Sequence, residues 1–299
     1  MPPRRMRAAG NVDAPLLTTV RLTVEYDGTD FCGFQWQPAL RTVAGTLEAA
    51  LSRLLTEPIK VSAAGRTDAG VHACGQVVSF STARAFPFER LGVALNSELP
   101  KDVGVREAAV ANPSFSARFS AVERTYVYAV LNRPQPSPLL ARHAYHVWLP
   151  IDPAAMTAAA AELLGERDFR SFCGILPENG VTIREVRRLR VERRGELLRI
   201  ETTASGFLHR MVRTIVGTLI DCGTGRRRAE ELPAILAARD RREAGHTAPA
   251  NGLYLAGVRY EDGYDSYAEP PLFRWAQLPS RSPRADARAG ESDPDSAGA

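Results

Sequence analysis

Apolar side chains recur at every second position in several short stretches, and this alternation restricts the fold of the 299-residue chain more than any other feature. Residues 20–26 and 124–130 show it most clearly. In the second stretch, Tyr126, Tyr128 and Val130 share one predicted strand face. Stretches with helical spacing lie between the strands, and this mixture predicts an α+β fold with a largely antiparallel sheet.

The other predicted elements follow from the same two periodicities. Apolar residues at helical spacing predict helices at 43–55, 88–97, 153–164, 207–221 and 230–239. Alternation predicts strands that begin at 59 and 76, a strand at 103–110, a hairpin at 181–204 and a last strand at 253–260. The order strand, helix, strands, helix, strand occurs twice, which is a weak indication of two similar α/β subdomains.

Shifts in composition indicate the domain boundaries. Residues 1–17 are rich in Pro, Arg and Ala without periodicity and are predicted to form a flexible arm. Residues 18–112 form the expected N-terminal half and residues 113–268 the C-terminal half. Residues 269–299 are rich in Pro, Ser, Arg, Asp and Gly, so we expect a disordered tail.

The basic residues are strongly biased toward arginine. Of the 38 Lys and Arg residues, only Lys60 and Lys101 are lysines. The planar guanidinium suits phosphate binding, although a biased genome composition would produce the same excess. No apolar run approaches the roughly 20 residues of a membrane span, and no signal-peptide core follows the basic start. We therefore expect a cytoplasmic protein with no membrane segment.

One loop, Gly65–Val78, presents a cation and a carboxylate two residues apart and then continues into a strand. Asp68 there could simply close a turn, as Asp often does, or act as a base, a nucleophile or an electrostatic partner. A nearby arginine favours the ionised carboxylate, and Arg66 and Arg213 are the candidates. Tyr126 offers a ring that could stack on a nucleobase or fill a core.

Nothing in the chain calls for a cofactor or a metal. His72 with Cys74, and His143 with His146, are ligand types, but neither pair has a third ligand at a helpful spacing. A glycine-rich phosphate loop is also lacking in the sequence. We therefore expect neither a metal centre nor a nucleotide or redox cofactor.

A series of ordered motifs resembles the TruA family of tRNA pseudouridine synthases. The active-site motif is Gly65-Arg-Thr-Asp-Ala-Gly-Val-His72, followed by Gly75-Gln-Val-Val78. The other matching motifs are Glu25-Tyr-Asp-Gly28, Phe115-Ser-Ala-Arg-Phe-Ser120, Arg124-Thr-Tyr-Val-Tyr128, Asp168-Phe-Arg-Ser-Phe172, Phe207-Leu-His-Arg-Met-Val-Arg213 with Ile215-Val-Gly217, and Gly252-Leu-Tyr-Leu255. One departure is Phe34, where the family usually has Trp.

The resemblance implies a specific activity and fold. It implies that the chain isomerises uridine to pseudouridine at positions 38, 39 and 40 in the anticodon stem-loop of tRNA, as a homodimer and without cofactor. Asp68 would be the catalytic aspartate, Tyr126 would stack on the uracil, Arg66 would hold the flipped nucleotide, and Arg213 would orient Asp68. The implied pseudouridine synthase fold joins two subdomains in one extended sheet.

Two alternatives remain at the level of sequence. The first is a non-catalytic tRNA-binding module, which the arginine excess would also suit, and the second is a synthase for another RNA site. The residues do not decide whether Asp68 attacks the sugar, attacks the base or drives elimination. Preferred tRNAs, dimer contacts and the role of the terminal arms are also undetermined by the sequence.

Overall fold

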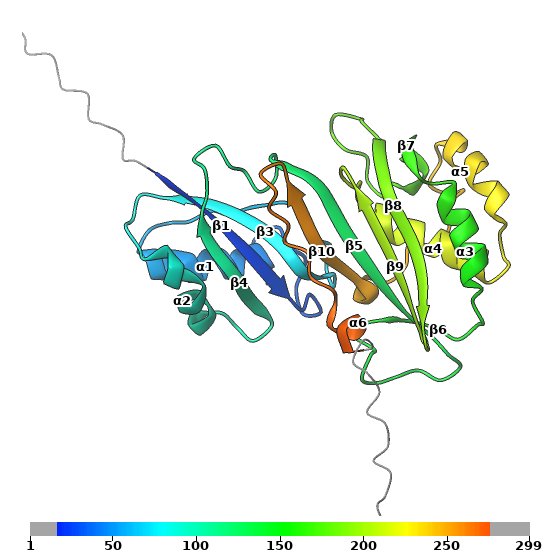
Figure 1. Cartoon of the computed structure of the whole chain (residues 1–299), viewed down its shortest axis with the longest axis horizontal. Coiled ribbons are helices and arrows are strands. Elements are labelled where there is room, and N and C mark those ends of the chain that lie inside the picture. The colour runs from blue at the N-terminus through cyan, green and yellow to red at the C-terminus, as the bar shows by residue number, and fades with distance from the viewer. Residues whose placement is uncertain (1–16, 276–299) are drawn as a thin grey trace, which may run out of the picture.

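The computed structural model describes residues 17–275, and its centre is one ten-stranded sheet (Figure 1). Its strands are β1 (Thr18–Tyr26), β2 (Ser62–Ala63), β3 (His72–Thr82), β4 (Val103–Val110), β5 (Ala121–Asn132), β6 (Tyr145–Val147), β7 (Gly165–Asp168), β8 (Ile183–Arg194), β9 (Leu197–Ala204) and β10 (Leu253–Tyr260). The α-helices are α1 (Val43–Leu55), α2 (Leu91–Glu98), α3 (Pro153–Ala161), α4 (Met211–Gly223), α5 (Leu232–Ala238) and α6 (Pro271–Trp275). The predicted α+β class is confirmed.

The strand order brings strands from the two predicted halves together in the middle of the sheet. The order is β4-β1-β3-β10-β5-β9-β8-β7, with β2 beside β3 and β6 beside β5. Pairs are antiparallel except β3–β10 and β5–β6. Strands from the two predicted halves meet at the β3–β10 pair, where Tyr254 lies opposite His72. The division at residue 112 into two domains stays a prediction.

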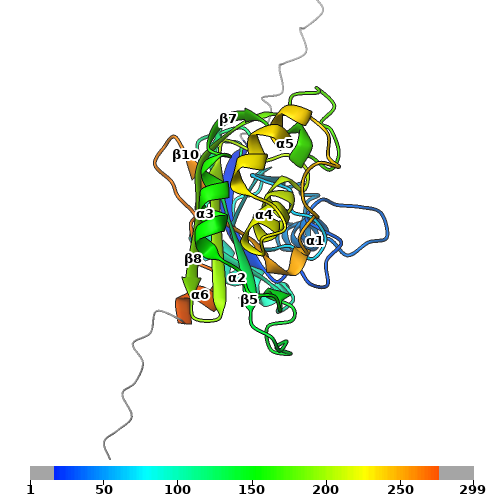
Figure 2. The same ribbon diagram turned by 90° about the vertical axis from the view of Figure 1, so that its right-hand side faces the viewer.

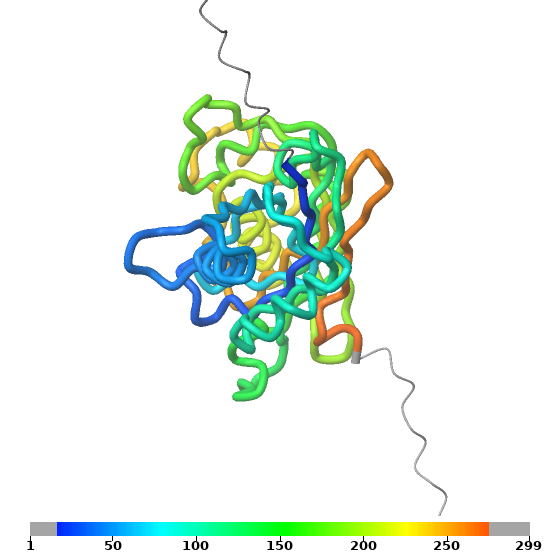
Figure 3. The backbone as a smooth tube through the Cα atoms, turned by 90° about the vertical axis from the view of Figure 1, so that its left-hand side faces the viewer, coloured from blue at the N-terminus to red at the C-terminus, as the bar shows by residue number. Residues whose placement is uncertain are grey.

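Most helices cover one face of this sheet. Figure 2 shows α1, α4 and α5 on the same side of the sheet. Figure 3 shows the blue and cyan segments of the first half of the chain from the opposite end of the molecule. The alternation in β5 matches this layering, because Tyr126, Tyr128 and Val130 lie in the larger core. Val127 and Ala129 point to the second face and pack in a smaller core.

Several element boundaries agree with the predictions, but some helix starts do not. The α-helix predicted at 88–97, for example, begins at Leu91. Helix α1 begins at Val43, as predicted, because Thr42 Oγ1 accepts a hydrogen bond from the Gly45 amide at 3.2 Å. The predicted helix at 207–221 instead begins at Met211. The backbone at Arg210 is left-handed, with φ of 59°, and this interrupts the helical conformation. The apolar residues before Arg210 fit the helical spacing of the sequence but lie outside the helix.

Three short strands show the limits of the period-two pattern. The strand expected to begin at residue 59 is reduced to the two residues of β2. Strands β6 and β7 were not predicted, because three or four residues are too few to show alternation.

The predicted disordered tail is wrong at its start. Within residues 269–299, α6 is ordered, and its Phe273 side chain is completely buried in the smaller core. Residues 276–299 of that prediction, and residues 1–16 of the predicted arm, lie outside the described residues. Among residues 17–275, none of the helices has the length and apolarity that a membrane span requires.

Candidate active site

A cavity of about 1060 Å³ opens on the helix-covered side of the sheet. Asp68, Tyr126, Arg66 and Arg213, the four site residues predicted from sequence, all line it. They come from the loop before β3, from β5 and from the start of α4. The fold therefore brings residues from both predicted halves to one place.

The loop that carries Asp68 is fixed by buried hydrogen bonds. Thr67 Oγ1 lies 2.8 Å from the Tyr26 hydroxyl, and the Thr67 carbonyl accepts a 3.0 Å bond from the Phe34 amide. Gln76 Nε2 donates to the Gly65 carbonyl at 2.7 Å. Burial raises the pKa of Tyr26 to about 12, so its hydroxyl stays protonated at neutral pH. The loop is thus held in the residues directly before Asp68.

Two glycines explain how this loop lies so close to its neighbours. A Cβ at Gly28 would lie 2.0 Å from the Val71 carbonyl oxygen, so only glycine permits the contact. Gly70 has a φ of 78°, which a side chain rarely adopts. At Gly65, by contrast, a Cβ would lie at an ordinary 3.6 Å from the Tyr126 hydroxyl.

Asp68 is oriented from the other half of the chain. Nη1 of Arg213 donates to Asp68 Oδ2 at 2.9 Å. The same guanidinium is held through Nε, which donates to the Ala248 carbonyl at 2.7 Å. The Asp68 side chain is 27% exposed and that of Arg213 is 15% exposed. Asp68 is therefore partly open to the cavity while its partner is nearly covered.

His209 is a neighbour of Asp68 that sequence reasoning did not assign to the site. Its Nε2 lies 3.8 Å from Asp68 Oδ1, the carboxylate oxygen that Arg213 leaves open. Burial lowers the pKa of His209 below its ordinary value of 6.5, which favours the neutral ring at neutral pH. The available signals were its place in the Phe207–Arg213 motif and in the helix predicted at 207–221, and neither assigned it a role in the site.

Tyr126 forms part of the cavity wall. Its side chain is 7% exposed, and its ring meets that of Phe207 edge to face at 5.1 Å between centroids. Burial raises the pKa of Tyr126 well above its ordinary value, so the hydroxyl remains neutral. A flat neutral ring that is fixed by a second ring can support a planar base without charge.

Further cations surround the cavity. Arg66 is exposed at its rim and, within residues 17–275, makes no ion pair. Arg118, Arg184 and Arg210 also line the cavity. Such a set of guanidinium groups around a neutral wall can bind phosphates while a base enters.

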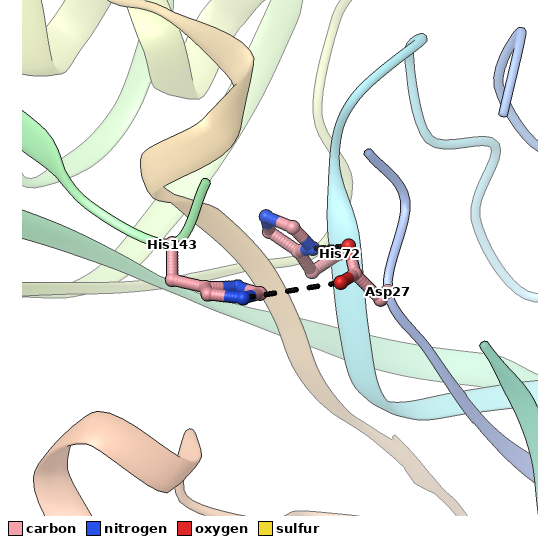
Figure 4. Close-up of side chains that lie close together, drawn as sticks. All are labelled: Asp27, His72 and His143. Carbon is pink, nitrogen blue, oxygen red and sulfur yellow. Dashed lines mark ion pairs between the residues drawn. The ribbon is translucent and has the colours of Figure 1, made fainter. Parts of the chain in front are cut away.

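A cluster of possible metal ligands lies behind the loop (Figure 4). Asp27 Oδ1 lies 3.1 Å from His72 Nδ1, and Asp27 Oδ2 lies 3.9 Å from His143 Nε2. The Gly28 amide also donates to His72 Nδ1 at 3.1 Å, and His72 Nε2 lies 3.0 Å from the Arg142 carbonyl oxygen.

Both nitrogens of the buried His72 ring are therefore engaged with the backbone. The ring connects the end of β1 to the second half of the chain, and this accounts for the cluster without a metal ion. The pairings considered from sequence, His72 with Cys74 and His143 with His146, are not those that the fold brings together. The prediction that the protein needs no metal stays a prediction.

Comparison with known proteins gives a consistent family match. The family model described as tRNA pseudouridine synthase matches residues 22–120 and 159–261. The chain is 47% identical over 235 residues to tRNA pseudouridine synthase A of Halalkalibacterium halodurans. The aligned region covers 78% of this chain and 89% of that protein. The protein of the same name from Moorella thermoacetica is 46% identical over 243 residues, covering 81% of this chain and 99% of its own length.

Similarity to solved structures is weaker. The crystal structure of the archaeal box H/ACA sRNP Nop10-Cbf5 complex matches 67% of this chain and 44% of that chain, with 15% identity and a TM-score of 0.29. The family is therefore assigned from the sequence relatives and the family model, and not from the Nop10-Cbf5 structure.

Proposed function

This chain belongs to the tRNA pseudouridine synthase A family and is an isomerase that modifies RNA, and from that premise we propose where and how it acts. We propose that it converts uridine to pseudouridine at positions 38, 39 and 40 in the anticodon stem-loop of tRNA, with Asp68 as the nucleophile. The observation that carries the proposal is the pairing of Asp68 with Arg213 inside a cavity whose wall is Tyr126.

The two carboxylate oxygens of Asp68 have different surroundings. Oδ2 accepts the hydrogen bond from Arg213, and Oδ1 faces the cavity with His209 at 3.8 Å. Arg213 sets the direction of the carboxylate, which a nucleophile requires. Oδ1 is therefore the oxygen that reaches the target nucleotide.

The other residues serve binding and retention in this proposal. The target base has to leave its stack before the glycosidic bond can be broken, as in other base-modifying enzymes. Tyr126 stacks on the freed uracil and keeps it in place while it turns to form the new carbon–carbon bond. Arg66, at the rim, holds the backbone of the flipped nucleotide. The reaction is an isomerisation, so no atom is gained or lost.

Product mapping tests the proposal. A tRNA pool from cells lacking the enzyme is incubated with the protein, and pseudouridine is located by carbodiimide modification and primer extension. We expect new signals at positions 38, 39 and 40. Signals at another tRNA position or in another RNA would refute the proposed substrate site.

A matched pair of variants tests the role of Asp68. Asp68→Asn keeps the shape and removes the charge, and we expect activity to fall by at least about 10³-fold while tRNA binding changes little. Asp240→Asn serves as the control, because Asp240 pairs with Arg242 at the surface, away from the cavity. An Asp68→Asn protein with normal turnover would overturn the nucleophile assignment.

We also propose, from family membership, a homodimer that acts in the cytoplasm. Because one chain has a mass of 32.6 kDa, sedimentation equilibrium distinguishes a monomer from a dimer easily. A monomer at micromolar concentration, with full activity, would contradict the dimer.

A further inference from the structure

The active-site cavity is larger than one flipped nucleoside requires. Pockets for drug-sized ligands run from about 300 to 1,000 Å³, and this cavity has about 1060 Å³. A uridine seated at Asp68 would occupy only part of that space. The remaining volume has room for the nucleotides on either side of the target, which are covalently joined to it.

Two exposed aromatic side chains line this cavity. Trp36 is 51% exposed and Phe119 is 80% exposed. Single exposed apolar residues are common and need no explanation by themselves. These two are distinguished by their location in the cavity, by rigid support and by a neighbouring cation.

The backbone beside Phe119 is firmly held, although its ring is exposed. The Ser120 amide donates to the Ser116 carbonyl at 3.0 Å, and Arg124 Nη2 donates to the Arg118 carbonyl at 2.7 Å. Ala117 is fully buried, and its carbonyl accepts a 2.9 Å bond from Tyr260. The segment is therefore fixed on both sides of Phe119, and the exposure of the ring does not come from a loose loop.

Arg124 also connects this segment to the catalytic loop. Its Nε and Nη2 donate to the Ala64 carbonyl at 3.1 and 3.0 Å, one residue before Gly65. The segment carrying Phe119 and the loop carrying Asp68 therefore share one guanidinium as an anchor.

Each exposed ring has a cation beside it. Lys60 Nζ lies 5.3 Å from the centre of the Trp36 ring, and Arg118 Cζ lies 5.1 Å from that of Phe119. Trp36 is also packed against the first turn of α1, where a Cβ at Gly45 would lie 3.3 Å from its Cδ1. Aromatic rings next to cations are the usual means of binding single-stranded nucleic acid, since every base has a face to stack.

We propose that Trp36 and Phe119 each stack on a nucleobase that flanks the flipped uridine, which makes them positioning residues for the RNA rather than catalytic ones. The proposal rests on the proposed tRNA substrate. Stacking tolerates any base, so these two rings would hold the loop on either side of the target without demanding a particular sequence there.

Tryptophan fluorescence tests Trp36 directly and without turnover. An anticodon stem-loop RNA is titrated into wild type, Trp36→Leu and Trp148→Leu. Trp148 is 65% exposed and is not among the residues that line the cavity, so it is the matched control. We expect RNA to quench wild type and Trp148→Leu equally, and to quench Trp36→Leu much less. Equal quenching of all three proteins would overturn the assignment of Trp36.

Steady-state kinetics test Phe119. We expect Phe119→Leu to raise KM for the stem-loop about tenfold with kcat within about twofold, and Phe119→Tyr to restore KM, as stacking predicts. Leu139→Ala, an 88% exposed apolar residue away from the cavity, should match wild type. An unchanged KM in Phe119→Leu would overturn this half of the proposal.

The two proposals fail in different ways. If wild type forms no pseudouridine, the proposed function fails, and the fluorescence titration still decides whether Trp36 meets RNA. If wild type forms pseudouridine but both aromatic variants behave as wild type, only the stacking inference fails.

Discussion

Arg213 and Asp68 are 145 positions apart in the sequence, yet Nη1 of the arginine lies 2.9 Å from Oδ2 of the aspartate. A second hydrogen bond from Arg213, to the Ala248 carbonyl, fixes the guanidinium from behind. The carboxylate is thus oriented by a side chain that is itself held, and this arrangement is the basis of the first prediction.

Replacing Arg213 should reduce turnover more than binding. In Arg213→Gln we expect kcat to fall about 100-fold with KM within about threefold. The Asp68 carboxylate would no longer point at the reacting atom, whereas the contacts that bind the RNA would remain. Arg213→Lys should retain part of the activity through its charge, but it loses the two-point attachment. Single-turnover assays measure the effect, with the surface variant Arg226→Gln as control. If Arg213→Gln had the kcat of wild type, the proposal that Arg213 orients Asp68 would be contradicted.

The ring of Tyr126 should matter for binding and its hydroxyl should not. In an Asp68→Asn background, which prevents turnover, we expect Tyr126→Phe to bind the stem-loop within twofold of its parent. Tyr126→Leu should bind about tenfold more weakly, since it loses the stacking surface. Filter binding measures both, and near-UV circular dichroism checks the fold. If Tyr126→Phe bound as weakly as Tyr126→Leu, recognition would depend on the hydroxyl.

Gly28 should be among the least replaceable glycines of the chain. A Cβ there would overlap the Val71 carbonyl oxygen at 2.0 Å, so the loop that carries Asp68 would have to move. We expect Gly28→Ala to lower the free energy of unfolding by about 3 kcal/mol and to reduce kcat as well. Gly180→Ala is the control. It has a φ of 68° but open space around it, and should cost only about 1 kcal/mol without loss of activity. Urea denaturation and the activity assay compare them.

Glu123 should contribute to stability in a defined pH range. The hydrogen bond from Arg259, together with that from Arg187, lowers the pKa of Glu123 from 4.5 to about 2. A carboxyl whose pKa is lower in the folded state stabilises the fold fully above pH 4.5, and this stabilisation is lost as the pH falls from 4.5 toward 2.

The variant Glu123→Gln isolates this contribution. At pH 7 we expect it to lower the free energy of unfolding by on the order of 1 kcal/mol after allowance for solvent screening. Its stability should also change less than that of wild type across this acid range. Thermal unfolding monitored from pH 7 to pH 3 makes the comparison, with Glu98→Gln as an exposed-pair control. Parallel curves for Glu123→Gln and wild type would contradict the assignment.

Local patterns predicted most of the fold, and contacts across the chain account for what they missed. The alternation in β5 and the apolar spacing in α1 were sufficient because each repeats over several residues. The start of α4 was missed because Arg210 adopts a left-handed conformation that its residue type does not reveal. Phe273 was assigned to a disordered tail because its partners on the second face of the sheet are distant in sequence.

The candidate site shows the same division. Asp68 was proposed from its motif, whereas the proximity of His209 depends on a turn that brings the segment before α4 beside the loop that carries Asp68. The exposure of Phe119 was not predictable either. The backbone beside this ring is held by the hydrogen bond from Arg124 to the Arg118 carbonyl, a contact that no periodicity encodes.

The position of β10 between β3 and β5 has a consequence for synthesis of the chain. The ribosome makes residues 253–260 after every other strand found in residues 17–275, yet these residues form the seam of the sheet. Until they emerge, the edges of β3 and β5 that they will cover have no β10 to pair with, and Asp68 has no fixed position relative to Arg213. A nascent chain stalled before residue 253 should therefore be inactive, sensitive to protease and dependent on chaperones. Activity should begin only when the final strand is released.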